Sequence, residues 1–293
     1  MNKAPSHRPD WIIGEVESAA GPVDKISTVL TGVDVWGHFL CRVSGHRNDY
    51  KVPPGLYAVG APGPQSDVFA GANYKMSFDR LRAALAGMDA WALALDTGGI
   101  NVWCAAGKGT FGTQELIGRM AASRLPEVVS HKRLIVPQLA AAGVSAHIVA
   151  RRTGFKVLFG PVMARDIPAY IAAGYKASAG MRSVPFGILD RLVLTPMEII
   201  PAMRWYPIFA CFILAVFGVN PSGVSLAEAL SGGWPYLLLG LLTVLSGALV
   251  VPLLLPWIPS RSFAAKGWIE CEAYPLSEDP KSKFFRSKAD SFR

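Results

Sequence analysis

Two long apolar runs without a charged residue lie in the last third of the chain, and they constrain its fold more than any other feature. The longer run, residues 234–258, can cross the ~30 Å hydrocarbon core of a bilayer as a helix. The shorter run, residues 205–219, reaches that length when its helix starts near residue 197. A tryptophan lies at three ends of these runs, as is typical of membrane interfaces: Trp205, Trp234 and Trp257. We expect a membrane region over 191–260, with transmembrane helices at 197–219 and 234–258. A buried hairpin in a soluble core is the alternative, but the length of the runs and their missing charges argue against it.

Basic residues flank the two runs on their outer sides. They are Arg182, Arg191 and Arg204 before the first run, and Arg261 and Lys266 after the second. The connecting segment 220–233 has neither lysine nor arginine, so the positive-inside rule places both flanks in the cytoplasm. The N-terminal sequence lacks the apolar core of a signal peptide, which agrees with this orientation. We therefore expect a multi-pass protein of the cytoplasmic (inner) membrane. Its domain 1–190 and its polar tail 261–293 are expected in the cytoplasm, the tail disordered and near anionic lipid.

Short apolar runs alternate with amphipathic stretches between residues 50 and 190. The expected strands are 55–62, 90–97, 133–140 and 155–162, and the expected helices are 78–88, 113–125, 143–154 and 165–174. Such alternation predicts an α/β fold with a Rossmann-like open parallel sheet, in which ligands bind beyond the carboxyl ends of the strands. The segment 101–113 follows one of these ends. Residues 29–43 have a mixed periodicity that predicts no single element.

The four cysteines and the net charge of +8 exclude several classes of function. Cys41, Cys104, Cys211 and Cys271 are widely spaced, with no CxxC pair, which argues against a structural zinc site and a disulfide framework. Free thiols suit a reducing cytosol. The basic residues are scattered along the chain and are most frequent near the membrane runs. They do not form the combined aromatic and basic motif of a nucleic-acid-binding module, so we expect no nucleic-acid partner.

The stretch NVWCAAGKGTFGT, residues 101–113, places one thiol, Cys104, among small residues after a buried strand. A phosphate-binding loop is disfavoured because Lys108 is followed by Gly109 and not by Ser or Thr. A nucleophilic Cys104 needs a base, but nothing in the sequence pairs it with a histidine. A small buried hydrophobe is the default for the other three cysteines. The small residues around Cys104 instead favour the approach of something broad and flat.

The segment NVWCAAGK, residues 101–108, resembles the cap-helix signature of the corrinoid protein family of microbial mercury methylation. The similarity extends over roughly residues 50–267 and is carried by five stretches: 55–79, 95–116, 159–171, 181–199 and 255–267. The resemblance also implies a distant relation to the corrinoid subunit of the corrinoid iron–sulfur protein of acetyl-CoA synthesis. Members of this family carry more membrane helices than the two expected here.

The resemblance implies that a cobalt corrinoid binds at this loop, with Cys104 as catalytic residue and lower axial ligand of the cobalt. The implied cofactor-binding residues are Asn101, Val102, Trp103, Cys104, Ala105, Ala106, Gly107, Lys108, Gly109 and Thr110. A thiolate is a soft, strongly donating ligand, and axial ligands set the electronics of such cofactors. Donation opposite a cobalt-bound methyl group favours its departure as a carbanion or radical, which suits an electrophilic acceptor.

The function implied by the resemblance is a membrane-tethered methyltransferase that passes a methyl group to Hg(II), forming methylmercury. Its implied partners are a ferredoxin-like iron–sulfur electron donor and a methyltetrahydrofolate-linked methyl donor. The separate electron donor agrees with the lack of clustered cysteines in this chain. Two alternatives stay open. One is a corrinoid methyl carrier of one-carbon metabolism, and the other is a non-enzymatic corrinoid-binding membrane module.

Overall fold

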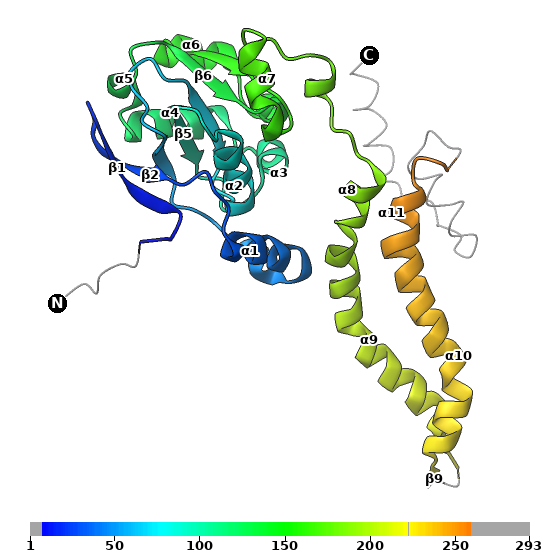
Figure 1. Cartoon of the computed structure of the whole chain (residues 1–293). Coiled ribbons are helices and arrows are strands. Elements are labelled where there is room, and N and C mark those ends of the chain that lie inside the picture. The colour runs from blue at the N-terminus through cyan, green and yellow to red at the C-terminus, as the bar shows by residue number, and fades with distance from the viewer. Residues whose placement is uncertain (1–7, 222, 259–293) are drawn as a thin grey trace, which may run out of the picture. The chain divides into compact units, whose positions relative to one another are not determined.

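The computed structural model describes residues 8–221 and 223–258, which form two compact units divided between residues 186 and 187. The first unit is an α/β domain built on a seven-stranded sheet with the order β1-β2-β3-β5-β4-β6-β7 (Figure 1). Its strands are β1 Ile12–Ser18, β2 Gly21–Ile26, β3 Gly55–Val59, β4 Val68–Ala72, β5 Ala90–Leu95, β6 Arg133–Val136 and β7 Lys156–Phe159.

The sheet is mixed, so the prediction of a parallel sheet is correct only for part of it. Strands β5, β4, β6 and β7 are parallel to one another, whereas β3 pairs antiparallel with β5 and β1 forms a hairpin with β2. The physical reason lies in the segment 60–67 between β3 and β4, which is shorter than the dozen or more residues that a parallel crossover needs. Strand β3 therefore runs against its neighbour.

Helices cover both faces of the sheet, and β5 shows why. Its sequence AWALAL alternates large and small residues, and all six are buried. Trp91, Leu93 and Leu95 face one core cluster, which includes Leu116 and Met120 of α4 (Thr113–Ala122). Ala90, Ala92 and Ala94 face the other cluster, where larger side chains from α2 (Lys75–Ala84) and α7 (Ile167–Ala172) fill the space. The remaining helical segments are α1 Gly32–Val43, η1 Gly45–Asn48, α3 Val102–Lys108, α5 Leu125–Val128, η2 Gln138–Ala142, α6 Ala146–Thr153, η3 Ala164–Asp166 and η4 Gly180–Arg182.

The expected strands and helices between residues 50 and 190 are found as β3, β5, β6, β7, α2, α4, α6 and α7. Their bounds are shorter than expected, except that α2 is shifted and begins at Lys75 instead of residue 78. Strand β4 was not predicted. The stretch 29–43, whose periodicity was ambiguous, forms α1, and the residues before it form the β1–β2 hairpin. These additions place a hairpin on one edge of the sheet and a helix beside α2.

The second unit consists mainly of two long helical segments joined by a tight hairpin. Its elements are α8 Ile188–Leu192, α9 Thr195–Gly218, β8 Val219–Asn220, β9 Gly223–Val224, α10 Leu226–Leu245, η5 Ser246–Val250 and α11 Val251–Leu254. Residues Ile188–Gly218 and Leu226–Leu254 are long and apolar enough to cross a membrane, by length and composition. The tail 261–293 lies outside the described residues.

Helix α10 begins earlier than predicted, because residues 226–233 are helical and not part of the connecting loop. The side chain of Ser225 caps this helix by accepting the Glu228 N–H. Glycines on α10 allow close packing on α9. A Cβ at Gly240 would lie 2.6 Å from the ring of Phe209, and one at Gly232 would lie 2.7 Å from that of Phe217. Such contacts through small residues are typical of packed transmembrane helices.

Candidate functional site

The carboxyl ends of β4 and β5 meet at one edge of the sheet, and Asn73 organises this edge. Asn73 follows β4 and is buried, with its side chain aimed at the loop after β5. Its Oδ1 accepts from the Thr97 N–H at 3.1 Å, the Thr97 hydroxyl at 2.9 Å and the Gly99 N–H at 3.0 Å. Its Nδ2 donates to Asp96 Oδ1 at 3.3 Å. The loop that leads into α3 is therefore fixed by one buried amide.

Helix α3 begins at Val102, directly after its N-cap Asn101, and carries Cys104 in its first turn. The Asn101 side chain caps the helix, because its Oδ1 accepts from the Cys104 N–H at 3.0 Å. Gly109 ends the helix with a φ of 84°, a left-handed conformation that favours glycine. Capping at both ends holds this short helix in place without help from the Cys104 side chain.

The inner side of α3 packs tightly onto the domain. Ala105 and Ala106 are buried in the core cluster that also contains Phe111. Gly143, which follows η2, lies so close that an added Cβ would be 3.1 Å from the Cα of Ala106 and 2.2 Å from the carbonyl oxygen of Phe111. The alanines of the motif thus anchor the helix, and larger residues would push it outward.

The outer side of α3 presents Cys104 and its neighbours at the surface. Cys104 is partly exposed, and the indole of Trp103 is 69% exposed. Beyond them, Gly107, Lys108, Gly109 and Thr110 are exposed, while Asn101 and Val102 are half-buried. Of the ten predicted site residues, the structure therefore brings the thiol, the indole and the glycine-rich turn to one surface segment. It places the side chains of Ala105 and Ala106 behind them.

The space beside the end of α3 is open. Apart from its chain neighbours and its own helix backbone, a Cβ at Gly107 or Gly109 would meet no atom within 4 Å. The loop therefore presents one partly exposed thiol beside a backbone that a ligand can approach closely.

The histidines that could have served a nucleophilic Cys104 are engaged elsewhere. The Nε2 of His131 lies 2.8 Å from the carbonyl oxygen of Ser66, and the Nδ1 of His147 lies 2.9 Å from the hydroxyl of Ser145. Within the described part of the chain, no group of three His, Cys, Asp or Glu residues is placed to hold a metal ion. Cys41, Cys104 and Cys211 are free thiols there, and Cys271 lies outside the described residues.

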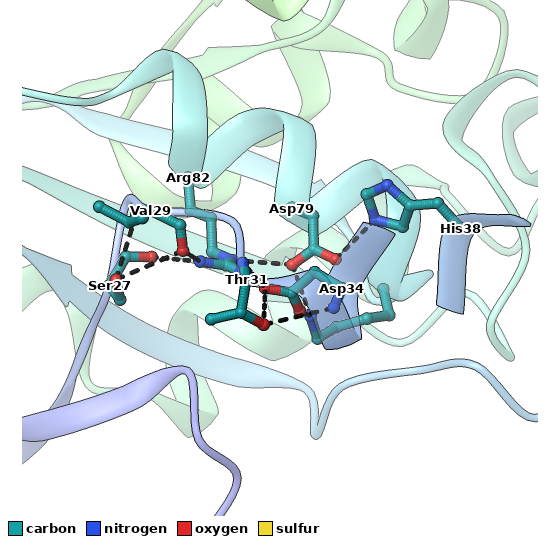
Figure 2. A network of polar contacts seen from close by, with 8 residues as sticks. Ser27, Val29, Thr31, Asp34, His38, Asp79 and Arg82 are labelled. Atoms are coloured by element: carbon teal, nitrogen blue, oxygen red, sulfur yellow. Dashed lines mark hydrogen bonds and ion pairs between the residues drawn. The ribbon is translucent and has the colours of Figure 1, made fainter. Parts of the chain in front are cut away.

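A second polar cluster, which the sequence did not reveal, lies buried between α1 and α2 (Figure 2). Lys75 Nζ donates to Asp34 Oδ1 at 2.7 Å and to Asp79 Oδ1 at 2.6 Å. Arg82 donates to Asp34 Oδ2 and to Asp79 Oδ1, each at 2.7 Å. The Nε2 of His38 lies 2.8 Å from Asp79 Oδ2. We call these five residues the α1–α2 charge network.

Arg82 also ties the segment before α1 to the network. Its Nη1 donates to the carbonyl oxygens of Ser27 at 2.6 Å and Val29 at 2.9 Å, as Figure 2 shows. These bonds satisfy backbone groups in a segment without regular structure. The network therefore fastens residues 27–34 and α1 to the domain.

In this network the negative charges of Asp34 and Asp79 are balanced by the positive charges of Lys75 and Arg82. This pairing lowers the pKa values of both carboxylates. Burial raises the pKa of Asp34, but bonds from Lys75, from the Thr31 N–H and from Arg82 outweigh burial, so the net pKa lies well below the ordinary value. Burial likewise raises the pKa of Asp79, and bonds from His38, Lys75 and Arg82 bring it below its ordinary value. Both carboxylates are therefore ionised at neutral pH.

Local sequence gave little warning of these residues. Lys75, Asp79 and Arg82 have the i, i+4 and i+3 spacing of an exposed helical ion pair, and only burial distinguishes them. Asn73 has partners 23 to 26 positions away, so no local pattern marks it. The one available signal was the mixed periodicity of residues 29–43, which arises because the polar side of α1 faces inward.

Comparison with known proteins finds one family that matches part of the α/β domain. Residues 44–171 match the family described as CO dehydrogenase/acetyl-CoA synthase delta subunit. This stretch runs from η1 to α7 and includes the whole of α3. It leaves out the second unit.

Individual relatives give the same picture. The acetyl-CoA decarbonylase/synthase complex subunit gamma of Archaeoglobus fulgidus is 31% identical over 127 residues, covering 43% of this chain and 27% of the relative. The same subunit of Methanopyrus kandleri is 28% identical over 133 residues, covering 45% and 28%. The corrinoid/iron-sulfur protein large subunit of Moorella thermoacetica is 25% identical over 176 residues, covering 53% and 39%. The domain is similar to part of these proteins. The chain spans between about a quarter and two fifths of their length.

Proposed function

We propose that the α/β domain binds a cobalt corrinoid at α3, with Cys104 as its lower axial ligand, and carries methyl groups between a donor and an acceptor. The observation that carries this proposal is the position of Cys104. It is one partly exposed thiol on a helix capped at both ends, at the ligand-binding edge of the sheet. Two similarities support the proposal: residues 44–171, which include α3, match the CO dehydrogenase/acetyl-CoA synthase delta subunit family, and part of the chain is similar to a corrinoid/iron-sulfur protein large subunit.

The residues of the loop have distinct tasks in this proposal. Asn101 holds the backbone of Cys104 so that the thiol points outward from a fixed helix turn. Gly107 and Gly109 leave the space that a flat ring needs, and Ala105 and Ala106 fix the helix from behind. The residues that would border the bound ring are Val102, Lys108, Thr110 and the exposed Trp103. The bound corrinoid supplies a cobalt centre that can accept and release a methyl group, and a soft thiolate ligand favours its release.

The methyl acceptor most consistent with the relatives belongs to one-carbon metabolism, because they are subunits of acetyl-CoA synthase and decarbonylase complexes. Hg(II) is the second candidate. It is favoured by one observation, the resemblance of residues 101–108 to the signature of mercury-methylating corrinoid proteins. In either case a ferredoxin-like iron–sulfur protein would supply electrons, and a methyltetrahydrofolate-linked protein would supply the methyl group.

We further propose that α9 and α10 anchor the domain in the cytoplasmic membrane, with the domain and the tail 261–293 on the cytoplasmic side. The support is the length and apolar composition of both helices and the position of the basic residues around them.

Corrinoid binding at α3 is tested with two glycines in the same conformation. Gly109 ends α3 and Gly154 ends α6, both with left-handed φ, so alanine at either position costs about 1 kcal/mol of stability. After anaerobic reconstitution of the full chain, we expect Gly109→Ala to weaken corrinoid binding about tenfold. Gly154→Ala should bind like the unchanged protein. Equal binding by both variants, or no corrinoid bound by the unchanged protein, would refute the site.

The acceptor is tested by anaerobic assays of the reconstituted full chain with added ferredoxin and methyl donor. Methylmercury formed in proportion to Hg(II) would favour the second candidate. Methyl transfer to an acetyl-CoA synthase without methylmercury would favour the first. No transfer to either would leave the non-enzymatic corrinoid-binding module as the better description.

A further inference from the structure

Helix α1 has its amphipathic character reversed relative to an ordinary surface helix. Its exposed residues are all apolar: Gly32, Val33, Val35, Trp36 and Phe39. The side chains of Val33, Trp36 and Phe39 are 71%, 59% and 49% exposed, and Val29, just before the helix, is exposed too. The charged residue Asp34 is buried instead. We call Val29, Val33, Val35, Trp36 and Phe39 the α1 outer face.

The α1 outer face is held outward by the α1–α2 charge network. Asp34 accepts from Lys75 and Arg82, so the opposite side of the helix cannot leave the domain without breaking buried ion pairs. Gly37 lies against Tyr50, where an added Cβ would be 2.4 Å from the hydroxyl oxygen. A rotation that buried the apolar residues would expose or separate these charges, so the apolar face stays outward.

The composition around the α1 outer face suits the interface of an anionic bilayer. Trp36 and Phe39 stack with their ring centres 5.2 Å apart, and aromatic side chains favour the headgroup level of a membrane. The segment after α1 carries the exposed basic residues Arg47 and Lys51 and the exposed His46, with Asp49 as the one exposed acid among them. Helices with an apolar face and a basic border bind anionic lipid surfaces.

The size of the α1 outer face favours lipid over a second copy of the chain. A helix of 12 residues is about 18 Å long, and one face of it provides less than the roughly 800 Å² per partner of a stable protein interface. Binding to lipid does not require so large a buried area when the domain is already held near the membrane. Met181 is still attached to the domain, because its carbonyl oxygen accepts from the Val162 N–H. It lies seven positions before the first residue of α8, where the proposed membrane anchor begins. Such a segment reaches at most about 25 Å, so the effective concentration of lipid near the domain is high.

We infer that the α1 outer face inserts into the interfacial layer of the anionic membrane leaflet, as a second attachment of the domain besides α9 and α10. The inference rests on the proposed membrane anchoring. It assigns a role to α1, which lies before the residues 44–171 that match the family.

The test uses the full chain in nanodiscs of phosphatidylcholine with phosphatidylglycerol, with the photo-crosslinker p-benzoylphenylalanine placed at one position at a time. At position 36, on the α1 outer face, we expect lipid adducts. At position 150, exposed on α6 over the other face of the sheet, we expect about tenfold fewer. A probe at position 239, exposed on α10, reports on the membrane anchor itself.

Each outcome decides between occupants. Lipid adducts at positions 36 and 239 support the inference. Adducts at 239 with none at 36 overturn the inference but leave the anchoring intact, whereas adducts at neither position overturn both. A crosslinked dimer through position 36, or a crosslink from position 36 to α9 or α10, would show that protein covers the α1 outer face.

A second measurement tests the inference without the crosslinker, whose insertion at position 36 could disturb folding. In the double variant Trp36→Ser with Phe39→Ser, both changed residues are exposed, so the domain should keep its fold and its corrinoid absorption. We expect hydrogen exchange of the α1 amides in anionic nanodiscs to be about tenfold faster than in the unchanged protein. Unchanged exchange would contradict the inference.

Discussion

The α3 loop and the α1–α2 charge network are opposite ways of using polar groups in one domain. The network has four formal charges and a histidine in a buried volume, with every charge paired. The α3 loop has one thiol at the surface, and the polar groups around it serve to hold the backbone. The α1–α2 charge network, which has more polar groups, stabilises the fold and does not bind a ligand. Chemistry needs a group that is free to meet a ligand, and a fully paired network has none to offer.

Removing one charge from the α1–α2 charge network should have the largest effect on stability and therefore tests its structural role most strongly. Asp79→Ala leaves Lys75 and Arg82 buried with a single carboxylate, which should cost about 3–5 kcal/mol of unfolding free energy. Denaturant unfolding of the full chain, followed by the near-UV signal of the buried Trp91, measures the loss. Asp49→Ala, at an exposed position, should change stability by about 0.5 kcal/mol or less. Similar values for the two variants would show that the network contributes little.

Acid perturbs the same network more gently, because protonation leaves the side chains in place. The folded-state pKa values of Asp34 and Asp79 lie below the unfolded value of about 4, so the folded state holds these protons less tightly. Their contribution to stability is complete above that pH and is lost as the pH falls toward the folded pKa values. We expect stability to decline below about pH 4. The decline should be shallower in Asp79→Asn, and an equal slope in both proteins would contradict the assignment.

Asn73 contributes both to the stability of the domain and to the position of the α3 loop. Its removal should therefore lower stability and corrinoid affinity moderately. Asn73→Ala removes the acceptor for three donors of the 97–99 loop, so we expect a loss of about 1–3 kcal/mol of stability. It should also weaken corrinoid binding, because the loop leads into α3. Gln65→Ala, which removes an exposed side-chain bond to Ser130, is the matched control and should do neither. Full corrinoid affinity in Asn73→Ala would show that the loop is positioned by other contacts.

The sequence predicts the parts of this fold whose cause is local. Strand β5 was evident because AWALAL is apolar throughout, as a strand buried on both faces must be. The α3 motif was evident because Cys104 and the small residues around it form one contiguous stretch, residues 101–108, that resembles a family signature. The antiparallel position of β3 follows from its short connection to β4, a strand that was not predicted. The early start of α10 has a local signal that was missed, because Ser225 caps the helix at the Glu228 N–H.

The missed functional and structural residues have a common physical reason. Asp34 and Lys75 are 41 positions apart, and each alone looks like an ordinary surface charge. Ala105 and Ala106 belong to the recognised motif, yet the structure buries their side chains behind the helix. A motif in sequence therefore shows which residues act together, and burial shows which of them can reach a ligand.

The central claim is that the Cys104 thiolate is the lower axial ligand of a corrinoid, while the protein fold does not depend on that thiol. The most direct measurement compares the absorption spectrum of corrinoid bound to the unchanged full chain with that bound to Cys104→Ala, and with Cys211→Ala as control. We predict that Cys104→Ala alters the spectrum and abolishes methyl transfer, while stability changes by about 1 kcal/mol or less. Cys211→Ala should leave the spectrum unchanged. An identical spectrum in Cys104→Ala would contradict the account.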